Sequence, residues 1–126
     1  MLWIFIVYFV LLWWAIALFP SKWVPVKHLP AVAITIAPFV FYHPIKYKIY
    51  NEKRLHNHEM RHIWQQRVLS PAFMLALYIL SSVILFIFYL IKFRSLYYAY
   101  EKSYWYNPFE VDARNHETIA GHLNQF

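Results

Sequence analysis

Two uncharged apolar runs constrain the fold of this chain more than any other feature. The first covers residues 2–19 and the second covers residues 71–91. As a helix, the first run is long enough to cross a hydrocarbon core of about 30 Å. No lysine or arginine precedes it, unlike the start of a cleaved signal peptide. We therefore expect a transmembrane anchor over residues 1–20. One further domain over residues 21–126 would include a second long apolar helix, residues 71–93.

The composition is also that of a membrane protein. Hydrophobic residues make up 61% of the 126 residues and charged residues make up 14%, whereas an average soluble domain has about 25% charged residues. Such a chain lacks the polar surface that keeps a protein dissolved. It contains no cysteine, which excludes disulfide bonds and thiolate ligands. A transition-metal site would therefore use histidine, aspartate or glutamate.

The basic residues are concentrated in the middle of the chain. Residues 20–70 contain eight lysines and arginines against Glu52 and Glu59, whereas residues 92–126 are balanced in charge. A basic segment beside apolar helices is typical of the cytoplasmic, anionic face of a membrane. We therefore expect a lipid bilayer as partner rather than nucleic acid. The basic loop would lie on the cytoplasmic side of an inner or cytoplasmic membrane.

Residues 31–43 predict short strands. They are rich in β-branched and aromatic residues, and Pro38 interrupts them, which is typical of two strands in an edge hairpin. Residues 20–30, which precede them, contain three prolines and predict a turn-rich connector. The fold class that follows is a mainly α, membrane-associated protein with a small β-hairpin.

Two helices are expected on either side of the second apolar run. Asn51 is a suitable N-cap for a helix that should end near Leu69, because Pro71 restricts the residue before it. The final helix should begin at Pro108, since proline suits the first helical position and Asn107 is a fair cap.

The first of these helices would carry the pattern His-Glu-x-x-His at residues 58–62. Side chains four positions apart share one face of a helix, so His58 and His62 can direct imidazole nitrogens at one metal ion. Glu59 lies one position round, where its carboxylate can take a proton from a water on that metal. The alternative is a polar helix that faces lipid headgroups, with its histidines in ordinary hydrogen bonds.

A catalytic zinc needs a third protein ligand and one open position. On a helix that begins at Pro108, Glu110, Arg114 and Glu117 line one face, and the small Ala113 beside them lets another helix approach closely. Glu110 is therefore the candidate third ligand. Two histidines with one glutamate are a known catalytic ligand set for Zn²⁺.

The segments HEMRHIWQQ and YNPFEVDAR resemble the motifs of gluzincin-type zincin metallopeptidases. The similarity is strongest to small bacterial and phage-type proteins that combine His-Glu-x-x-His-x-x-Gln-Gln with Asn-Pro-Phe-Glu-x-x-Ala. It covers residues 31–117 without the second apolar run. The resemblance implies a minimal zincin-like core of an active-site helix, a short β-hairpin and a C-terminal helix that bears the glutamate.

The resemblance also implies roles for individual residues. The metal would be Zn²⁺, held by His58, His62 and Glu110. Glu59 would be the general base, and Gln65 and Gln66 would support the site or pack beside it. The edge strand within residues 31–42 would hold a peptide or protein substrate in extended form. Two features depart from the family pattern, namely Ala37, where such domains often have glycine, and the apolar insert.

Hydrolysis through an oxyanion usually needs a second donor besides the metal. The sequence offers four candidates and does not choose among them: Arg114, Tyr104, Tyr106 and His116. For each of them an interfacial or solvated position is the ordinary alternative. The histidines expected to lie outside the site are His28, His43 and His56.

The second apolar run creates a topological conflict. If residues 71–91 crossed the bilayer, His58 and His62 would lie on one side and Glu110 on the other. One ion could then not bind all three side chains. The conflict must be resolved by the path of the chain, or Glu110 is not a ligand.

Two paths would return the chain to its starting side. The run can break at Ser81 into a re-entrant hairpin, or it can lie in the interface or against the first run. We expect the second path, with the tyrosine-rich residues 97–106 at headgroup depth. Arg61 and Lys102 should then be accessible from the same side.

The leading functional hypothesis is a membrane-anchored zinc metallopeptidase that hydrolyses peptide bonds with a zinc-activated water. One alternative is a non-catalytic membrane or virion component that keeps the fold. Another is a basic membrane-surface or nucleic-acid-binding protein whose histidines are incidental. The sequence leaves open whether the chain forms a homo- or hetero-oligomer.

Overall fold

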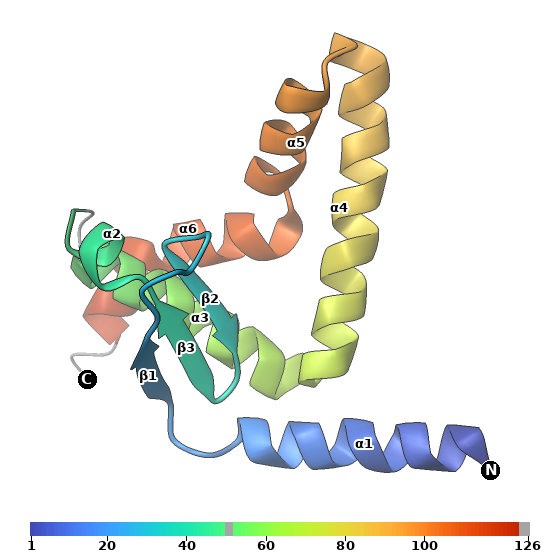
Figure 1. Ribbon diagram of the computed structural model, residues 1–126, viewed down its shortest axis with the longest axis vertical. Coiled ribbons are helices and arrows are strands. Elements are labelled where there is room, and N and C mark those ends of the chain that lie inside the picture. The colour runs from blue at the N-terminus through green and yellow to red at the C-terminus, as the bar shows by residue number, and fades with distance from the viewer. Residues whose placement is uncertain (50–51, 124–126) are drawn as a thin grey trace.

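The computed structural model describes residues 1–49 and 52–123 and, in the last helix, the side chains up to Glu117. The described part of the chain is mainly helical, with one small sheet (Figure 1). The helices are α1 (Leu2–Ala17), α2 (Pro44–Ile49), α3 (Glu52–Leu69), α4 (Pro71–Phe93), α5 (Leu96–Trp105) and α6 (Pro108–Leu123). The strands are β1 (Lys22–Pro25), β2 (Ala33–Ile36) and β3 (Phe39–Tyr42). The expected cap Asn51 lies outside the described residues.

The sheet contains the predicted hairpin and one strand that the sequence did not predict. β2 and β3 are antiparallel, with Thr35 opposite Val40, and β1 pairs in parallel on the other side of β3. β1 lies within the segment expected to be a turn-rich connector. The strand order β1-β3-β2 leaves β2 at an edge. One face of the sheet packs on α3 through a small core of Ala37, Val40 and Ile63, which also includes Ala17 of α1.

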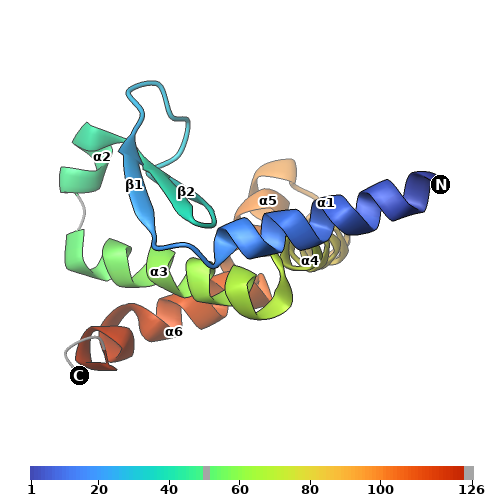
Figure 2. The same ribbon diagram turned by 90° about the horizontal axis from the view of Figure 1, so that it is seen from below.

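Helix α3 lies beneath the sheet, and α6 packs alongside α3 on the side away from the sheet (Figure 2). Helix α6 begins at Pro108, as predicted, and Asn107 Oδ1 accepts a hydrogen bond of 3.0 Å from the Phe109 amide. Ala113 is fully buried, consistent with a small side chain at a close helix contact. An ion pair of 2.7 Å between Arg61 and Asp112 joins the two helices. The fold thus brings the His-Glu-x-x-His helix and the C-terminal helix together.

The apolar insert forms a helical hairpin with the segment that follows it. Helix α4 is continuous through Ser81 and Ser82, so the re-entrant break considered at that point is absent. Instead α5 turns back beside the far half of α4 (Figure 1). Asn107 Nδ2 then donates hydrogen bonds to the Tyr78 carbonyl (3.1 Å) and to Ser82 Oγ (2.8 Å). The chain returns by this path, so Glu110 lies on the same side as the histidines.

Helix α1 ends two residues earlier than the apolar run and docks on the end of α3. Trp14 Nε1 donates to the Arg67 carbonyl at 2.7 Å. The Arg67 guanidinium donates to the carbonyls of Ala17 (2.9 Å) and Phe19 (2.7 Å). Carbonyls at the C-terminal end of a helix lack partners within the helix and carry partial negative charge. Arg67 therefore caps α1 and fixes it to α3.

The two apolar helices run crosswise, as both views of the molecule show (Figures 1 and 2). Within the residues that the structure describes, α4 is the one helix long and apolar enough to cross a membrane. Helix α1 has 16 residues, which is about 24 Å of helix, and most of its side chains are exposed. The exposed apolar surface of both helices supports a membrane location. Because they are crosswise, they cannot both cross one bilayer.

Candidate metal centre

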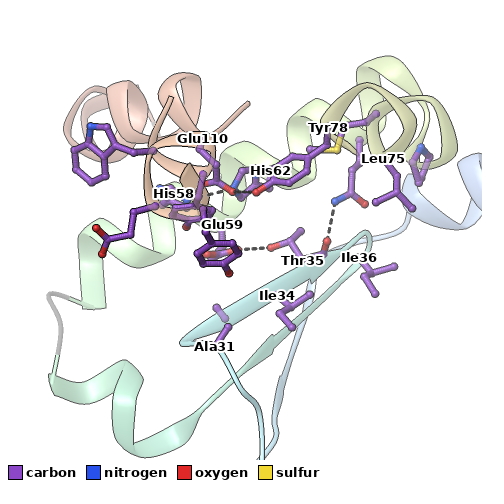
Figure 3. A pocket seen from close by; sticks show the side chains of 18 of the residues that line it. Ala31, Ile34, Thr35, Ile36, His58, Glu59, His62, Leu75, Tyr78 and Glu110 are labelled. Carbon is purple, nitrogen blue, oxygen red and sulfur yellow. Dashed lines mark hydrogen bonds and ion pairs between the residues drawn. The ribbon is translucent and has the colours of Figure 1, made fainter. Parts of the chain in front are cut away.

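Three buried side chains from two helices converge on one point (Figure 3). His58 and His62 lie one turn apart on α3, and Glu110 lies in the first turn of α6. The two Nε2 atoms are 3.2 Å apart. Glu110 Oε2 is 3.0 Å from His58 Nε2, and Glu110 Oε1 is 3.3 Å from His62 Nε2. The candidate ligands thus form a buried group that can hold a metal ion.

The spacing of these atoms fits a small tetrahedral ion. Ligand atoms placed 2.0–2.1 Å from a tetrahedral zinc stand about 3.3 Å from one another. The two imidazole nitrogens are 3.2 Å apart and each has one of the two Glu110 oxygens at 3.0 or 3.3 Å, while one ligand atom from each residue lies within 4.8 Å of the others. One side of the group faces a pocket, which leaves room for the open position that a catalytic site needs.

Each imidazole is also held by its second ring nitrogen. His58 Nδ1 is 3.0 Å from Glu117 Oε1, and His62 Nδ1 is 2.9 Å from Gln65 Oε1. Carboxylate and amide oxygens accept hydrogen bonds, so both Nδ1 atoms are donors and both Nε2 atoms turn a lone pair inward. Two lone pairs and a carboxylate then face one another. This arrangement needs a proton or a metal ion at its centre.

Without a metal ion, the electrostatics of the group favour a proton between the histidines and Glu110. Burial raises the pKa of Glu110, but hydrogen bonds from His58 and His62 outweigh burial and hold it well below its usual value. Burial lowers the pKa of His62, while the hydrogen bond and the charge of Glu110 raise it to about 9. At neutral pH the metal-free site therefore pairs a protonated histidine with a carboxylate.

Gln65 connects His62 to α6. Its Nε2 donates to the Phe109 carbonyl at 3.0 Å and to Asp112 Oδ2 at 2.8 Å. Asp112 in turn accepts from Arg61. These bonds leave the Gln65 carbonyl oxygen facing His62, which sets the ring orientation. Gln65 therefore supports the site, one of the two roles expected for it.

Glu59 lies beside the group and under the edge strand. It is buried, and Thr35 Oγ1 donates a hydrogen bond to its carboxylate (Figure 3). Gln66 donates to the Thr35 carbonyl at 2.9 Å and accepts from the Ala37 amide at 2.7 Å, which holds β2 on α3. In an antiparallel pair, the N–H and C=O groups of every second residue bond to the partner strand, and those of the residues between point away from it. The N–H and C=O groups of Ala33 and Thr35 point away from β3, toward the site.

A pocket of about 910 Å³ lies over the group. Its floor contains the candidate ligands and Glu59, and one wall is the edge strand β2. The other walls come from α1, α4 and α5. The apolar helices therefore line the site as well as carrying the exposed apolar surface.

Of the four candidate oxyanion donors, Tyr104 lines the pocket. The other three are engaged elsewhere. Arg114 stacks on the ring of Trp105 at 3.9 Å and donates to its carbonyl, and Tyr106 stacks on Tyr89. His116 Nδ1 lies 2.8 Å from the Asp112 carbonyl oxygen.

Two residues of the site were not assigned a role from the sequence. Tyr78 of α4 donates its hydroxyl to Glu110 Oε1 at 2.9 Å, and Glu117 accepts from His58. Glu117 could have been found, because it lies two helical turns after Glu110 on the same face. The only signal for Tyr78 was a hydroxyl within an apolar run.

The three histidines expected to lie outside the site do so, and each has its own surroundings. His56 stacks on Trp23 with ring centroids 4.8 Å apart, and burial lowers its pKa. His43 Nδ1 accepts from the backbone at the start of α2. His28 is not part of the buried group.

The sequence matches no family model, and no similar curated protein or solved structure was found. The likeness to zincin metallopeptidases therefore rests on the residues and on the site that they form.

Proposed function

We propose that this chain is a membrane-anchored zinc metallopeptidase with a zincin-like core. The observation that carries the proposal is the buried meeting of His58, His62 and Glu110, with Glu59 beside them. Residues separated by 52 positions converge with ligand-like spacing. A polar helix that merely faced headgroups would have no reason to bury this set of side chains.

The chemistry assigned to the site is hydrolysis of a peptide bond. A Zn²⁺ ion in this group would lower the pKa of a bound water to about 7 and polarise the substrate carbonyl. Glu59, held in place by Thr35, accepts the proton of the attacking water and delivers it to the leaving amine as the carbon–nitrogen bond breaks. Tyr104, whose side chain lines the pocket, is the hydroxyl donor for the developing oxyanion, because the hydroxyl of Tyr78 is already donated to Glu110.

The edge strand supplies a place for the substrate. The backbones of Ala33 and Thr35 point toward the pocket, so an extended peptide can add to β2 as a further strand. Its carbonyls would then pass directly over Glu59 and the ligand group. The partners proposed for the chain are therefore a peptide or protein substrate and a lipid bilayer.

The membrane arrangement is part of the same proposal. Helix α1 serves as the anchor, and the basic segment between residues 20 and 70 faces anionic lipid on the cytoplasmic side. The exposed apolar side chains of α4 support a site close to the bilayer surface.

Metal analysis and one substitution test the proposal. Purified protein in detergent should contain one zinc per chain. Glu59→Gln should keep the zinc and lose hydrolysis of a casein or peptide-library substrate by at least about a hundredfold. Glu52→Gln, on the exposed start of the same helix, is the matched control and should keep activity.

The alternatives give other outcomes. A non-catalytic membrane or virion component would keep the fold, with or without zinc, and would hydrolyse no substrate. A basic membrane-surface protein would contain no stoichiometric zinc.

A further inference from the structure

The hydrogen bonds of β2 determine which of its backbone groups point toward the pocket. The amide of His43, just after β3, donates to the Val32 carbonyl at 2.9 Å. Bonding to the partner strand alternates from one residue to the next, so this contact fixes the register of the whole pair. The N–H and C=O groups of Ala33 and Thr35, and the N–H of Ala37, therefore lie on the outer edge.

The side-chain amide of Gln66 occupies one part of this edge. Its Nε2 donates to the Thr35 carbonyl at 2.9 Å, and its Oε1 accepts from the Ala37 amide at 2.7 Å. The N–H and C=O of a residue in an added strand would bond to the same two groups. Gln66 therefore takes the place of one residue of a neighbouring strand.

The fold keeps Gln66 in this position. Its side chain is buried, and so is Ala37, whose amide it accepts. Movement of Gln66 out of the edge would leave buried polar groups without partners, which is unfavourable. A peptide in the pocket would therefore find this part of the edge already bonded.

The rest of the edge remains open to a ligand. Among the residues that the structure describes, no protein group bonds to the outward N–H and C=O of Ala33 or to the N–H of Thr35. Figure 3 shows Ala31 and Ile36 at opposite ends of the strand, with Thr35 facing Glu59 between them. The open groups thus begin beside Glu59 and extend toward Ala31, away from the hairpin tip.

We propose that Gln66 limits the main-chain pairing of a bound peptide to one side of the bond that lies beside Glu59. The inference rests on the proposed peptidase function and names the form of its substrate. On one side of that bond, Ala33 and Thr35 hold the peptide as an added strand. On the other side the peptide meets the Gln66 amide and must leave the strand direction. The substrate is therefore a polypeptide that is extended on one side of the cleaved bond and turns away on the other.

Methylation of peptide nitrogens tests the inference. Peptides from a random library would be selected by retention on zinc-loaded Glu59→Gln protein in lipid nanodiscs, and protein with Glu59 intact would identify their cleaved bond. Each backbone nitrogen outside that bond would then be methylated in turn, and binding to Glu59→Gln protein followed by fluorescence anisotropy. Loss of a donor to the edge should raise the dissociation constant at least about threefold on the paired side. On the other side the change should stay below about twofold.

Gln66→Met, in the same Glu59→Gln background, is the matched variant. Methionine is similar in size to glutamine but has no amide, so the Thr35 carbonyl becomes open to the peptide. Methylation should then weaken binding at a further position, on the far side of the cleaved bond. Val68→Met places the same side chain on the exposed face of α3 and should keep the original pattern.

The outcomes separate this inference from the proposed function. Similar losses on both sides of the cleaved bond with Gln66 present would overturn the inference, whether or not Gln66→Met folds, and would leave the peptidase function standing. An unchanged pattern in folded Gln66→Met protein would also overturn it. A further sensitive position in Gln66→Met, for a peptide that is bound but never cleaved, would overturn the peptidase function and support the role of Gln66. Retention of no peptide would overturn both.

Discussion

The hydroxyl of Tyr78 donates a hydrogen bond of 2.9 Å to Glu110 Oε1 and so joins the apolar helix α4 to the candidate metal group. The two residues are 32 positions apart in the sequence. They meet because Asn107, at the start of α6, donates to the carbonyl of Tyr78 itself. Helix α4 is therefore a wall of the site and a support for one of its ligands.

Tyr78→Phe should weaken metal binding and leave the fold intact. Loss of the hydroxyl removes a hydrogen bond that orients Glu110, and partners of this kind are worth about 10- to 100-fold in metal affinity. The zinc dissociation constant, measured by competition with a chromogenic chelator, should rise by that factor. Tyr97→Phe removes a hydroxyl that contacts Glu101 away from the group and is the control. Equal zinc affinity in both variants would show that Tyr78 does not support the ligand.

Asn107→Ala should destabilise the whole protein. Asn107 is fully buried, donates to Tyr78 and Ser82, and accepts from the Phe109 amide at the start of α6. Its loss leaves several buried polar groups without partners and removes an N-cap, at a cost of about 2–3 kcal/mol. Chemical denaturation followed by circular dichroism would measure this.

The control for that substitution lies on the same helix. Asn115 of α6 is exposed, so Asn115→Ala should change the free energy of unfolding by less than about 0.5 kcal/mol. Similar effects of the two substitutions would mean that the contacts of Asn107 contribute little to stability.

The elements that the sequence predicted well are those with local signals. The start of α6 depends on Asn107 and Pro108, and the end of α3 depends on Pro71, all of which act on neighbouring residues. The spacing of His58 and His62 follows directly from helical periodicity. Glu110 was the candidate third ligand from its place on the predicted final helix, the motif resemblance implied the same, and the two helices do pack together.

The elements that were missed depend on contacts between distant segments. β1 forms in a proline-rich segment because it can pair in parallel with β3, a non-local arrangement that leaves no pattern of its own. Helix α5 returns beside α4 because aromatic rings meet across the hairpin, as Tyr89 and Tyr106 do with centroids 5.8 Å apart. Tyr78 acquires its role only through this return.

The metal-free protein should lose stability as the pH rises. In the folded state Glu110 raises the pKa of His62 to about 9, whereas an unfolded histidine titrates near 6.5. The stabilisation from protonated His62 is therefore fully present below about pH 6.5 and is lost as the pH rises through about 9. The apparent melting temperature in the presence of a chelator should fall across this window.

Two comparisons check the assignment of this titration to His62. His62→Gln should flatten the pH dependence, because the titrating group is gone. In the wild type, zinc displaces the same proton, so zinc affinity should increase with pH over the same window. A melting temperature of the metal-free protein that rises between pH 6.5 and 9 would contradict the proposed charge state.

The path of α5 predicts which apolar helix enters the bilayer. Helix α5 carries Glu101 and Lys102 and lies beside the far half of α4. If α4 crossed the membrane, these charges would enter the hydrocarbon core at a cost of about 2.5–3.5 kcal/mol each. We therefore expect α4 to lie along the interface and α1, which runs crosswise to it, to enter the bilayer.

Single-cysteine labelling distinguishes the two orientations, and the natural chain contains no cysteine to interfere. Lys53 is an exposed residue of α3 and a better probe than Arg61, which is paired with Asp112. In sealed vesicles, Lys53→Cys, Lys102→Cys and Arg94→Cys should all react with an impermeant maleimide from the same side. Arg94 follows the far end of α4, so it would react only after permeabilisation if α4 crossed the membrane. That result would place α1 along the surface instead and remove it as the anchor.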